Sequence, residues 1–125
     1  MNKKKILVID DEPIIRRALK RALEQFITEM SIEVSMETDG NRGLRSILEI
    51  HPHVILLDFM MPGLNGIEIL EKMKEQNIHI PVIFMTAYGD RETEIKLKNL
   101  PDVTFLTKPF EDIQKLISLV KSKLT

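Results

Sequence analysis

Runs of apolar residues recur along the whole chain, separated by longer amphipathic segments. Four of the runs consist almost entirely of Val, Ile, Leu, Phe and Met, as expected for strands that are covered on both faces. The other run alternates between apolar and polar residues. The predicted strands are Ile6–Ile9, Ile32–Glu37, Val54–Leu57, Val82–Met85 and Val103–Leu106.

After each strand, apolar residues are spaced by three and four positions, which is the spacing of a helix with one buried face. The segment after the fourth strand has the fewest such positions. The apolar positions are Ile15, Leu19, Leu23 and Phe26; Leu44, Ile47 and Leu48; Ile67, Leu70 and Met73; Ile95, Leu97 and Leu100; and Ile113, Leu116, Ile117, Val120 and Leu124.

Strict alternation of strand and helix predicts a parallel sheet with helices on both faces. We therefore expect a three-layer α/β/α sandwich of the (βα)5 flavodoxin-like type, with a parallel five-stranded sheet of order 2-1-3-4-5. In such a sheet, ligands bind beyond the carboxyl ends of the strands where the strand order reverses, here between the first and third strands. At 125 residues, a single domain over 1–125 is expected.

Composition narrows the function classes. Hydrophobic residues make up 43% and charged residues 30%, which is typical of a soluble globular domain. The 18 Lys and Arg nearly balance the 19 Asp and Glu, so no overall field favours direct nucleic-acid binding. The absence of Cys excludes disulfides and thiolate metal sites. The apolar run after Met1–Lys5 is too short for a signal peptide or a membrane span, so we expect a cytoplasmic location.

Polar residues follow the strands and suggest chemistry. Asp10 and Asp11 come after the first strand, Asp58 after the third, Thr86 after the fourth and Lys108 after the fifth. Gathered carboxylates repel one another and require a cation, and oxygen ligands without His or Cys favour Mg²⁺. A lysine and a hydroxyl could then hold a phosphoryl group. A carboxylate can itself be the nucleophile, and Asp58 is the natural acceptor.

These residues resemble the response-regulator receiver domain (CheY-like) of two-component signalling, over essentially the whole chain. Each motif is weak alone, but their order and spacing together are specific. The motifs are Asp10-Asp11-Glu12-Pro13, Asp58 followed by Met61-Pro62-Gly63 and Gly66, Thr86-Ala87, Phe105, and Lys108-Pro109-Phe110.

The resemblance implies roles for the site residues. Asp58 is the phospho-acceptor, and it ligates Mg²⁺ together with Asp11 and the backbone carbonyl of Met60. Asp10 acts on the ion through bound water. Lys108 pairs with the phosphoryl oxygens. The donor is a phosphohistidine on a sensor histidine kinase or a histidine phosphotransfer protein. The resemblance does not specify the output partner or fused effector domain.

The resemblance also implies a conformational switch. Thr86 moves toward the phosphoryl group and the ring of Phe105 follows. Met60 and Tyr88 occupy positions that tune phosphoryl lifetime. Phosphorylation-dependent homodimers through the fourth helix, fifth strand and fifth helix are common in this family. The domain is then no enzyme beyond its own phosphotransfer and slow autodephosphorylation.

Other readings stay open. A Mg²⁺-dependent aspartyl-nucleophile phosphohydrolase has a similar sheet, and an unphosphorylated binding module could keep this fold. Asp10 or Asp11 alone could simply cap a helix. The basic face of the first helix most simply faces water, although it could dock a kinase helix beside Ile14 and Ala18. That face comprises Arg16, Arg17, Lys20 and Arg21, and His51, His53 and His79 are expected at the surface. The resemblance also implies a cis peptide before Pro109.

Overall fold

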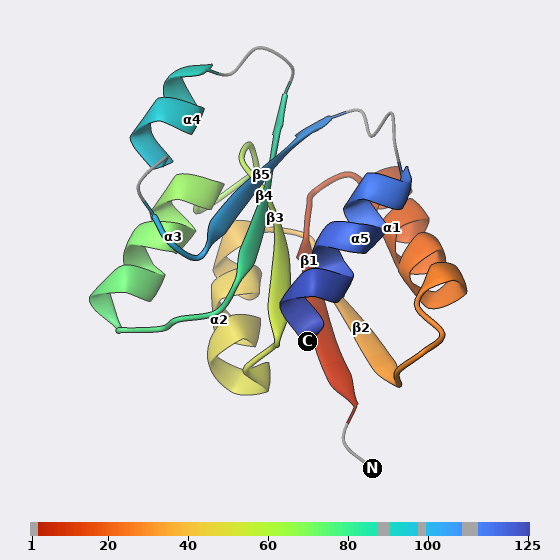
Figure 1. Ribbon diagram of the computed structural model, residues 1–125. Coiled ribbons are helices and arrows are strands. Elements are labelled where there is room, and N and C mark those ends of the chain that lie inside the picture. Colours follow the sequence, from red (N-terminus) through yellow and green to blue (C-terminus); the bar gives the residue numbers. More distant parts are fainter. Residues whose placement is uncertain (1–2, 88–90, 98–99, 109–112) are drawn as a thin grey trace.

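The computed structural model describes residues 3–87, 91–97, 100–108 and 113–125, and its described elements form a parallel sheet between two layers of helices (Figure 1). The sheet order is β2-β1-β3-β4-β5, which confirms the predicted three-layer sandwich. The elements are β1 (Lys4–Ile9), α1 (Pro13–Phe26), β2 (Ile32–Glu37), α2 (Gly40–Ile50), β3 (Val54–Asp58), α3 (Gly66–Glu75), β4 (Val82–Ala87), α4 (Arg91–Leu97), β5 (Val103–Lys108) and α5 (Ile113–Leu124).

Several strands are longer than the apolar pattern predicts. Asp58 is the last residue of β3 rather than the first residue of a loop, and Thr86 and Lys108 lie within β4 and β5. The cause is pairing between neighbours, because Thr86 lies opposite Thr107 and Ala87 opposite Lys108 in the parallel ladder. The backbone of Asp58, Thr86 and Lys108 is therefore part of the paired strands of the sheet.

The core consists of two layers, because successive strand residues point to opposite faces of the sheet. Ile6 and Val8 of β1 pack with α1 and α5, whereas Leu7 and Ile9 pack with α2 and α3. Figure 1 shows the same division, with α1 and α5 on one side of the sheet and α2 and α3 on the other. Burial on both faces fixes the strands that carry the acidic residues.

Helix α4 departs from the expected pattern. We predicted Ile95, Leu97 and Leu100 as its apolar face, but Ile95 is 71% exposed and Leu100 lies beyond the helix. Among the α4 residues whose side chains are described, Thr93 and Leu97 are buried. These two positions are four residues apart and share one face, whereas Ile95 lies on the other side of the helix.

Candidate functional site

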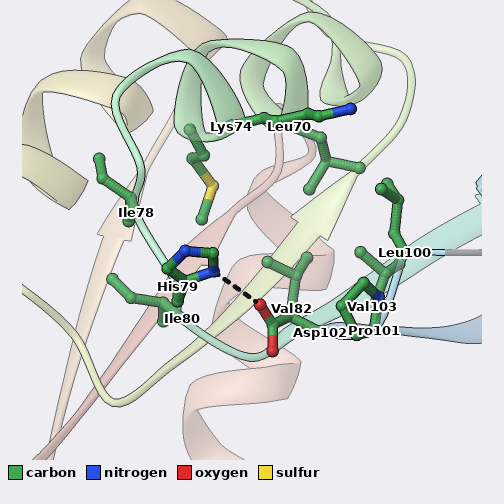
Figure 2. A pocket seen from close by; sticks show the side chains of 11 residues that line it. Leu70, Lys74, Ile78, His79, Ile80, Val82, Leu100, Pro101, Asp102 and Val103 are labelled. Atoms are coloured by element: carbon green, nitrogen blue, oxygen red, sulfur yellow. Dashed lines mark ion pairs between the residues drawn. The ribbon is translucent and has the colours of Figure 1, made fainter.

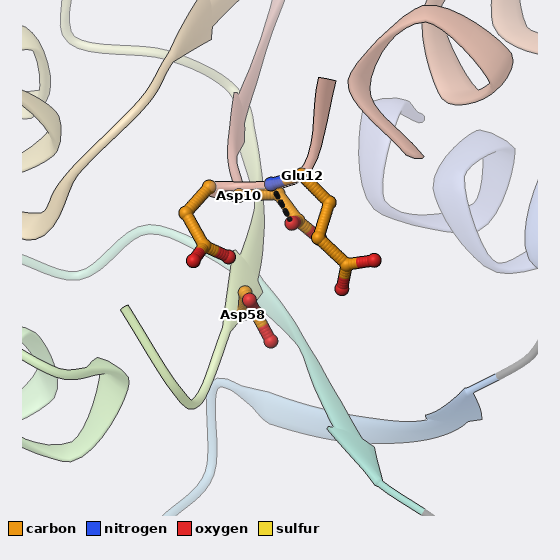
Figure 3. A group of neighbouring side chains, drawn as sticks. Asp10, Glu12 and Asp58 are labelled. Carbon is orange, nitrogen blue, oxygen red and sulfur yellow. Dashed lines mark hydrogen bonds between the residues drawn. The ribbon is translucent and has the colours of Figure 1, made fainter. Parts of the chain in front are cut away.

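Four carboxylates gather at the carboxyl ends of β1 and β3. Because Ile9 lies opposite Leu57 in the ladder, the next residues along the two strands, Asp10 and Asp58, become neighbours. One oxygen from each of Asp10, Asp11, Glu12 and Asp58 lies within 4.8 Å of the others. Figure 3 shows Asp10, Glu12 and Asp58 of this cluster. Asp10 is fully buried and Asp58 is only 6% exposed, whereas Asp11 and Glu12 are exposed. Two carboxylates of the cluster are thus buried, and the other two are accessible to solvent.

The structure brings together three residues that the sequence predicted as metal ligands, Asp10, Asp11 and Asp58, and adds Glu12. Glu12 was not among the candidate ligands. The available signal was its place as the third consecutive acidic residue after β1. The turn into α1 folds its carboxylate back toward the other three.

The backbone around Asp10 is held by local hydrogen bonds. The Glu12 backbone N–H donates to Asp10 Oδ1 at 2.9 Å, and the Arg16 guanidinium donates to the Asp10 carbonyl oxygen at 2.7 Å. The first expectation for Arg16, that it only faces water, is therefore wrong. The capping interpretation of Asp10 and Asp11 is wrong as well, since the residue that precedes α1 is Glu12 and its side chain makes no capping bond.

The charge and chemistry of this cluster suit a hard divalent cation. Four carboxylates within 4.8 Å of one another repel one another when ionised, and a cation between them would offset this repulsion. Every donor in the cluster is a carboxylate oxygen, the ligand type that Mg²⁺ and Ca²⁺ prefer. The exposure of Asp11 and Glu12 leaves the cluster accessible to the water that Mg²⁺ usually retains.

The segment between Asp58 and α3 is tied to the sheet and to the helix. The Phe59 N–H donates to the Met85 carbonyl at 3.2 Å, and the Gly66 N–H donates to the Phe59 carbonyl at 2.9 Å. Asn65 forms a capping box with Glu68 at the start of α3. Met60, the predicted carbonyl ligand, lies in this segment with an exposed side chain.

The predicted switch residues lie on neighbouring strands. Thr86 is 2% exposed near the end of β4, one position beyond the residue that pairs with Asp58. Phe105 is half-buried on β5, and its ring meets the Phe84 ring edge-on with centroids 5.9 Å apart. Phe105 thus packs against the face that carries α3 and α4.

Other predicted residues fall partly or wholly outside the description. Lys108 ends β5, but its side chain lies outside the described part of the chain, as do Tyr88 and Pro109. The register nevertheless sets the backbone of Lys108 at the same edge of the sheet as Asp58 and Thr86.

A pocket lies at the end of the sheet opposite the acidic cluster (Figure 2). It has a volume of about 170 Å³ at the amino ends of β4 and β5. An ion pair at this pocket joins His79 Nδ1 to Asp102 Oδ2 at 3.5 Å. The predicted surface position of His51, His53 and His79 is confirmed. The aliphatic lining residues are Leu70, Met73, Ile78, Ile80, Val82, Leu100 and Val103.

Known proteins are similar to this chain in sequence and in fold. Residues 6–121 match the family model of the response regulator receiver domain. The chain is 35% identical over 124 residues to sporulation initiation phosphotransferase F of Bacillus subtilis (strain 168), which covers 99% of this chain and 96% of that protein. The receiver domain of the Francisella response regulator 1452 superimposes with a TM-score of 0.85 at 36% identity, covering 98% of this chain and 97% of that one. The chain therefore belongs to the response regulator receiver family.

Many relatives are longer than this chain. Regulatory protein AtoC of Escherichia coli (strain K12) is 33% identical over 120 residues, which is 96% of this chain but 25% of that protein. The chain likewise spans 44% of the probable transcriptional regulator ycf27 of Cyanophora paradoxa. Within the described residues, no helix has the length and apolar character that a bilayer crossing requires.

Membership defines the general function. The chain is a receiver domain of two-component signal transduction, a class of domain that is regulated by phosphorylation. This confirms the resemblance drawn from the motifs and favours a receiver over the phosphohydrolase reading.

Proposed function

We propose that Asp58 accepts a phosphoryl group from a phosphohistidine on a sensor histidine kinase or a histidine phosphotransfer protein. The observation that carries the proposal is the position of Asp58: it ends a central strand, is nearly buried, and shares its surroundings with three other carboxylates. In the transfer, the bond from phosphorus to the imidazole nitrogen breaks, and a bond from phosphorus to an Asp58 oxygen forms.

We infer that the carboxylates of Asp11 and Asp58 and the backbone carbonyl of Met60 hold Mg²⁺, with Asp10 acting through bound water. The bound ion supplies positive charge that offsets the repulsion between the incoming phosphoryl group and the acidic cluster. The carboxylate of Asp10 is buried beside that of Asp58, which supports a role for both at one ion.

Lys108 and Thr86 complete the proposed site. In this proposal the Lys108 ammonium pairs with the phosphoryl oxygens, and the Thr86 hydroxyl donates a hydrogen bond to one of them. The buried Thr86 must shift to do so, and the ring of Phe105 follows into the space it leaves. In this proposal Met60 and Tyr88 tune how long the phosphoryl group persists.

The partner surfaces follow from exposed residues. Ile14 is largely exposed at the start of α1 and lines a shallow groove with Arg17 and Ala18, which suits the docking of a kinase or phosphotransfer helix. We also propose homodimerisation through α4, β5 and α5 after phosphorylation, and an output partner or effector domain of unknown type. The domain is proposed to occupy 1–125, to act in the cytoplasm, and to catalyse only its own phosphorylation and slow dephosphorylation.

Acetyl phosphate tests the acceptor directly. Incubation of the protein with acetyl phosphate and MgCl₂ should add one phosphoryl group, measured by intact-protein mass spectrometry. Chelation of Mg²⁺ with EDTA or the change Asp58→Asn should abolish the addition. Asp102→Asn, an acidic residue remote from the cluster, is the matched control and should label like the wild type.

Two results would count against this function. If Asp58→Asn is labelled as strongly as the wild type, the acceptor is another residue. Repeated turnover of small phosphomonoesters would instead support a phosphohydrolase.

A further inference from the structure

The loop after Asp58 lies directly against the first turn of α2. The Gly40 N–H donates to the Pro62 carbonyl at 3.4 Å. A Cβ atom built on Gly40 would come 2.6 Å from the carbonyl carbon of Leu64 and 2.9 Å from its Cβ. Real Cβ atoms do not approach other heavy atoms so closely, so any side chain at position 40 must displace either the loop or the helix.

The contact is reciprocal. Gly63 has a φ of 75°, a left-handed conformation that favours glycine. A Cβ built on Gly63 would come 2.8 Å from the side-chain nitrogen of Asn41. Asp39 caps the first turn of α2, because its carboxylate accepts a hydrogen bond from the Arg42 N–H at 2.9 Å. The loop and the start of α2 therefore lie in close contact at two points.

This contact bears on the proposed ion site through Met60. On one side of Met60, Phe59 is tied to β4 and to Gly66. On the other side, the next described backbone tie of the loop is the bond from Gly40 to Pro62. The place of the Met60 carbonyl thus depends on where α2 holds Pro62 to Leu64.

We propose that Gly40 is a positioning residue for the divalent-ion site. The first turn of α2 sets the loop so that the Met60 carbonyl reaches the ion held by the carboxylates. This inference rests on the proposed function. Because coupling between two parts of a molecule is reciprocal, binding of the ion should also perturb the first turn of α2.

Two alanine variants of the same helix test the inference. Gly40→Ala should raise the Kd for Mg²⁺ about tenfold, since groups that orient metal ligands commonly matter to this extent. Gly43→Ala is the matched control: it adds the same atoms to α2, but the three atoms nearest its Cβ are side-chain atoms of Ile9, at 2.8 to 3.1 Å, and not atoms of the loop after Asp58. Its Kd for Mg²⁺ should equal that of the wild type. Titration calorimetry with MgCl₂, without any phosphoryl donor, measures all three.

The outcomes separate the two proposals. If the wild type takes up no Mg²⁺, the proposed function fails. If the wild type binds Mg²⁺ and folded Gly40→Ala binds it equally well, or if Gly43→Ala is weakened as much, only the positioning role is wrong.

A second measurement covers the case in which Gly40→Ala does not fold. In the wild type, MgCl₂ should shift the amide resonances of Gly40 and Asn41 with the same Kd as the amide of Asp58. Fixed resonances at Gly40 and Asn41 during that titration would overturn the proposal.

Discussion

The two ends of the sheet differ in chemistry although they belong to the same five-stranded sheet. At the carboxyl end, β1 and β3 deliver four carboxylates to one point, two of them buried. At the amino end, β4 and β5 border an apolar pocket of about 170 Å³ beside an exposed ion pair. The pocket at the amino end is lined mainly by aliphatic side chains, whereas the carboxyl end holds the acidic groups. The reactive groups therefore lie at the end where β1 and β3 bring carboxylates together.

The difference has an energetic basis. An apolar wall stabilises the fold by itself, since burying aliphatic surface is favourable. Buried carboxylates do the opposite unless a cation or donor compensates them. Asp10 has one such donor in the Glu12 N–H, and a cation would compensate the cluster further, whereas the aliphatic pocket needs neither.

The largest expected effect comes from the amino end. Met73→Ala removes a side chain that is buried in the core and also lines the pocket, so it should lower the free energy of unfolding by about 2–5 kcal/mol. Urea denaturation measures this loss. Mg²⁺ affinity of the folded variant should not change, and a large drop in that affinity would show that the two ends are not independent.

At the carboxyl end, stability should depend on the metal. Mg²⁺ at about one hundred times its Kd should raise the free energy of unfolding of the wild type by about 2.7 kcal/mol. Asp11→Asn replaces an exposed carboxylate of the cluster and should remove most of this gain. Thermal unfolding with MgCl₂ and with EDTA provides the comparison. Equal gains in both proteins would argue against a site at this cluster.

A smaller effect is expected at the start of α3. Asn65→Ala removes the side chain that accepts from the Glu68 N–H at 2.9 Å, and loss of such a cap costs about 1 kcal/mol. Urea denaturation again measures the change. Glu71→Ala, on the exposed side of the same helix, serves as the control and should change stability much less.

The ion pair at the amino end should contribute little. The side chains of His79 and Asp102 are 73% and 43% exposed, and exposed pairs are worth less than about 1 kcal/mol. His79→Gln should leave both urea stability and Mg²⁺ binding close to the wild type. A loss as large as that of Met73→Ala would mean that this pair holds the pocket closed.

The smallest effect concerns Glu29, which pairs with Lys121 at 2.9 Å. A backbone hydrogen bond, and then the Lys121 side chain, lower the pKa of Glu29. A lowered folded-state pKa stabilises the protein above the unfolded pKa, and this contribution is lost as pH falls through the folded value. NMR titration of the Glu29 carboxyl carbon should give a midpoint below that of Lys121→Ala. Identical midpoints would exclude a role for the pair.

Much of the fold was predictable from sequence because burial on both faces leaves continuous apolar runs, as in Val54–Leu57. The clustering of Asp10, Asp11 and Asp58 was predictable too, since parallel strands end at the same edge. Helix α4 was not, because Ile95 suggested a face that the structure exposes. Contacts between distant segments were also hidden: no local pattern predicts that Gly40 meets Leu64, or that Arg16 binds the Asp10 carbonyl.

Reductive trapping of the phosphorylated protein tests the central claim most directly, because four carboxylates lie within 4.8 Å and only one is proposed as the acceptor. Borohydride converts an aspartyl phosphate into homoserine, and peptide mass spectrometry locates it. The account predicts homoserine at position 58 after treatment with acetyl phosphate and MgCl₂. Reduction at position 10 or 11 instead, or at no acidic residue, would contradict it.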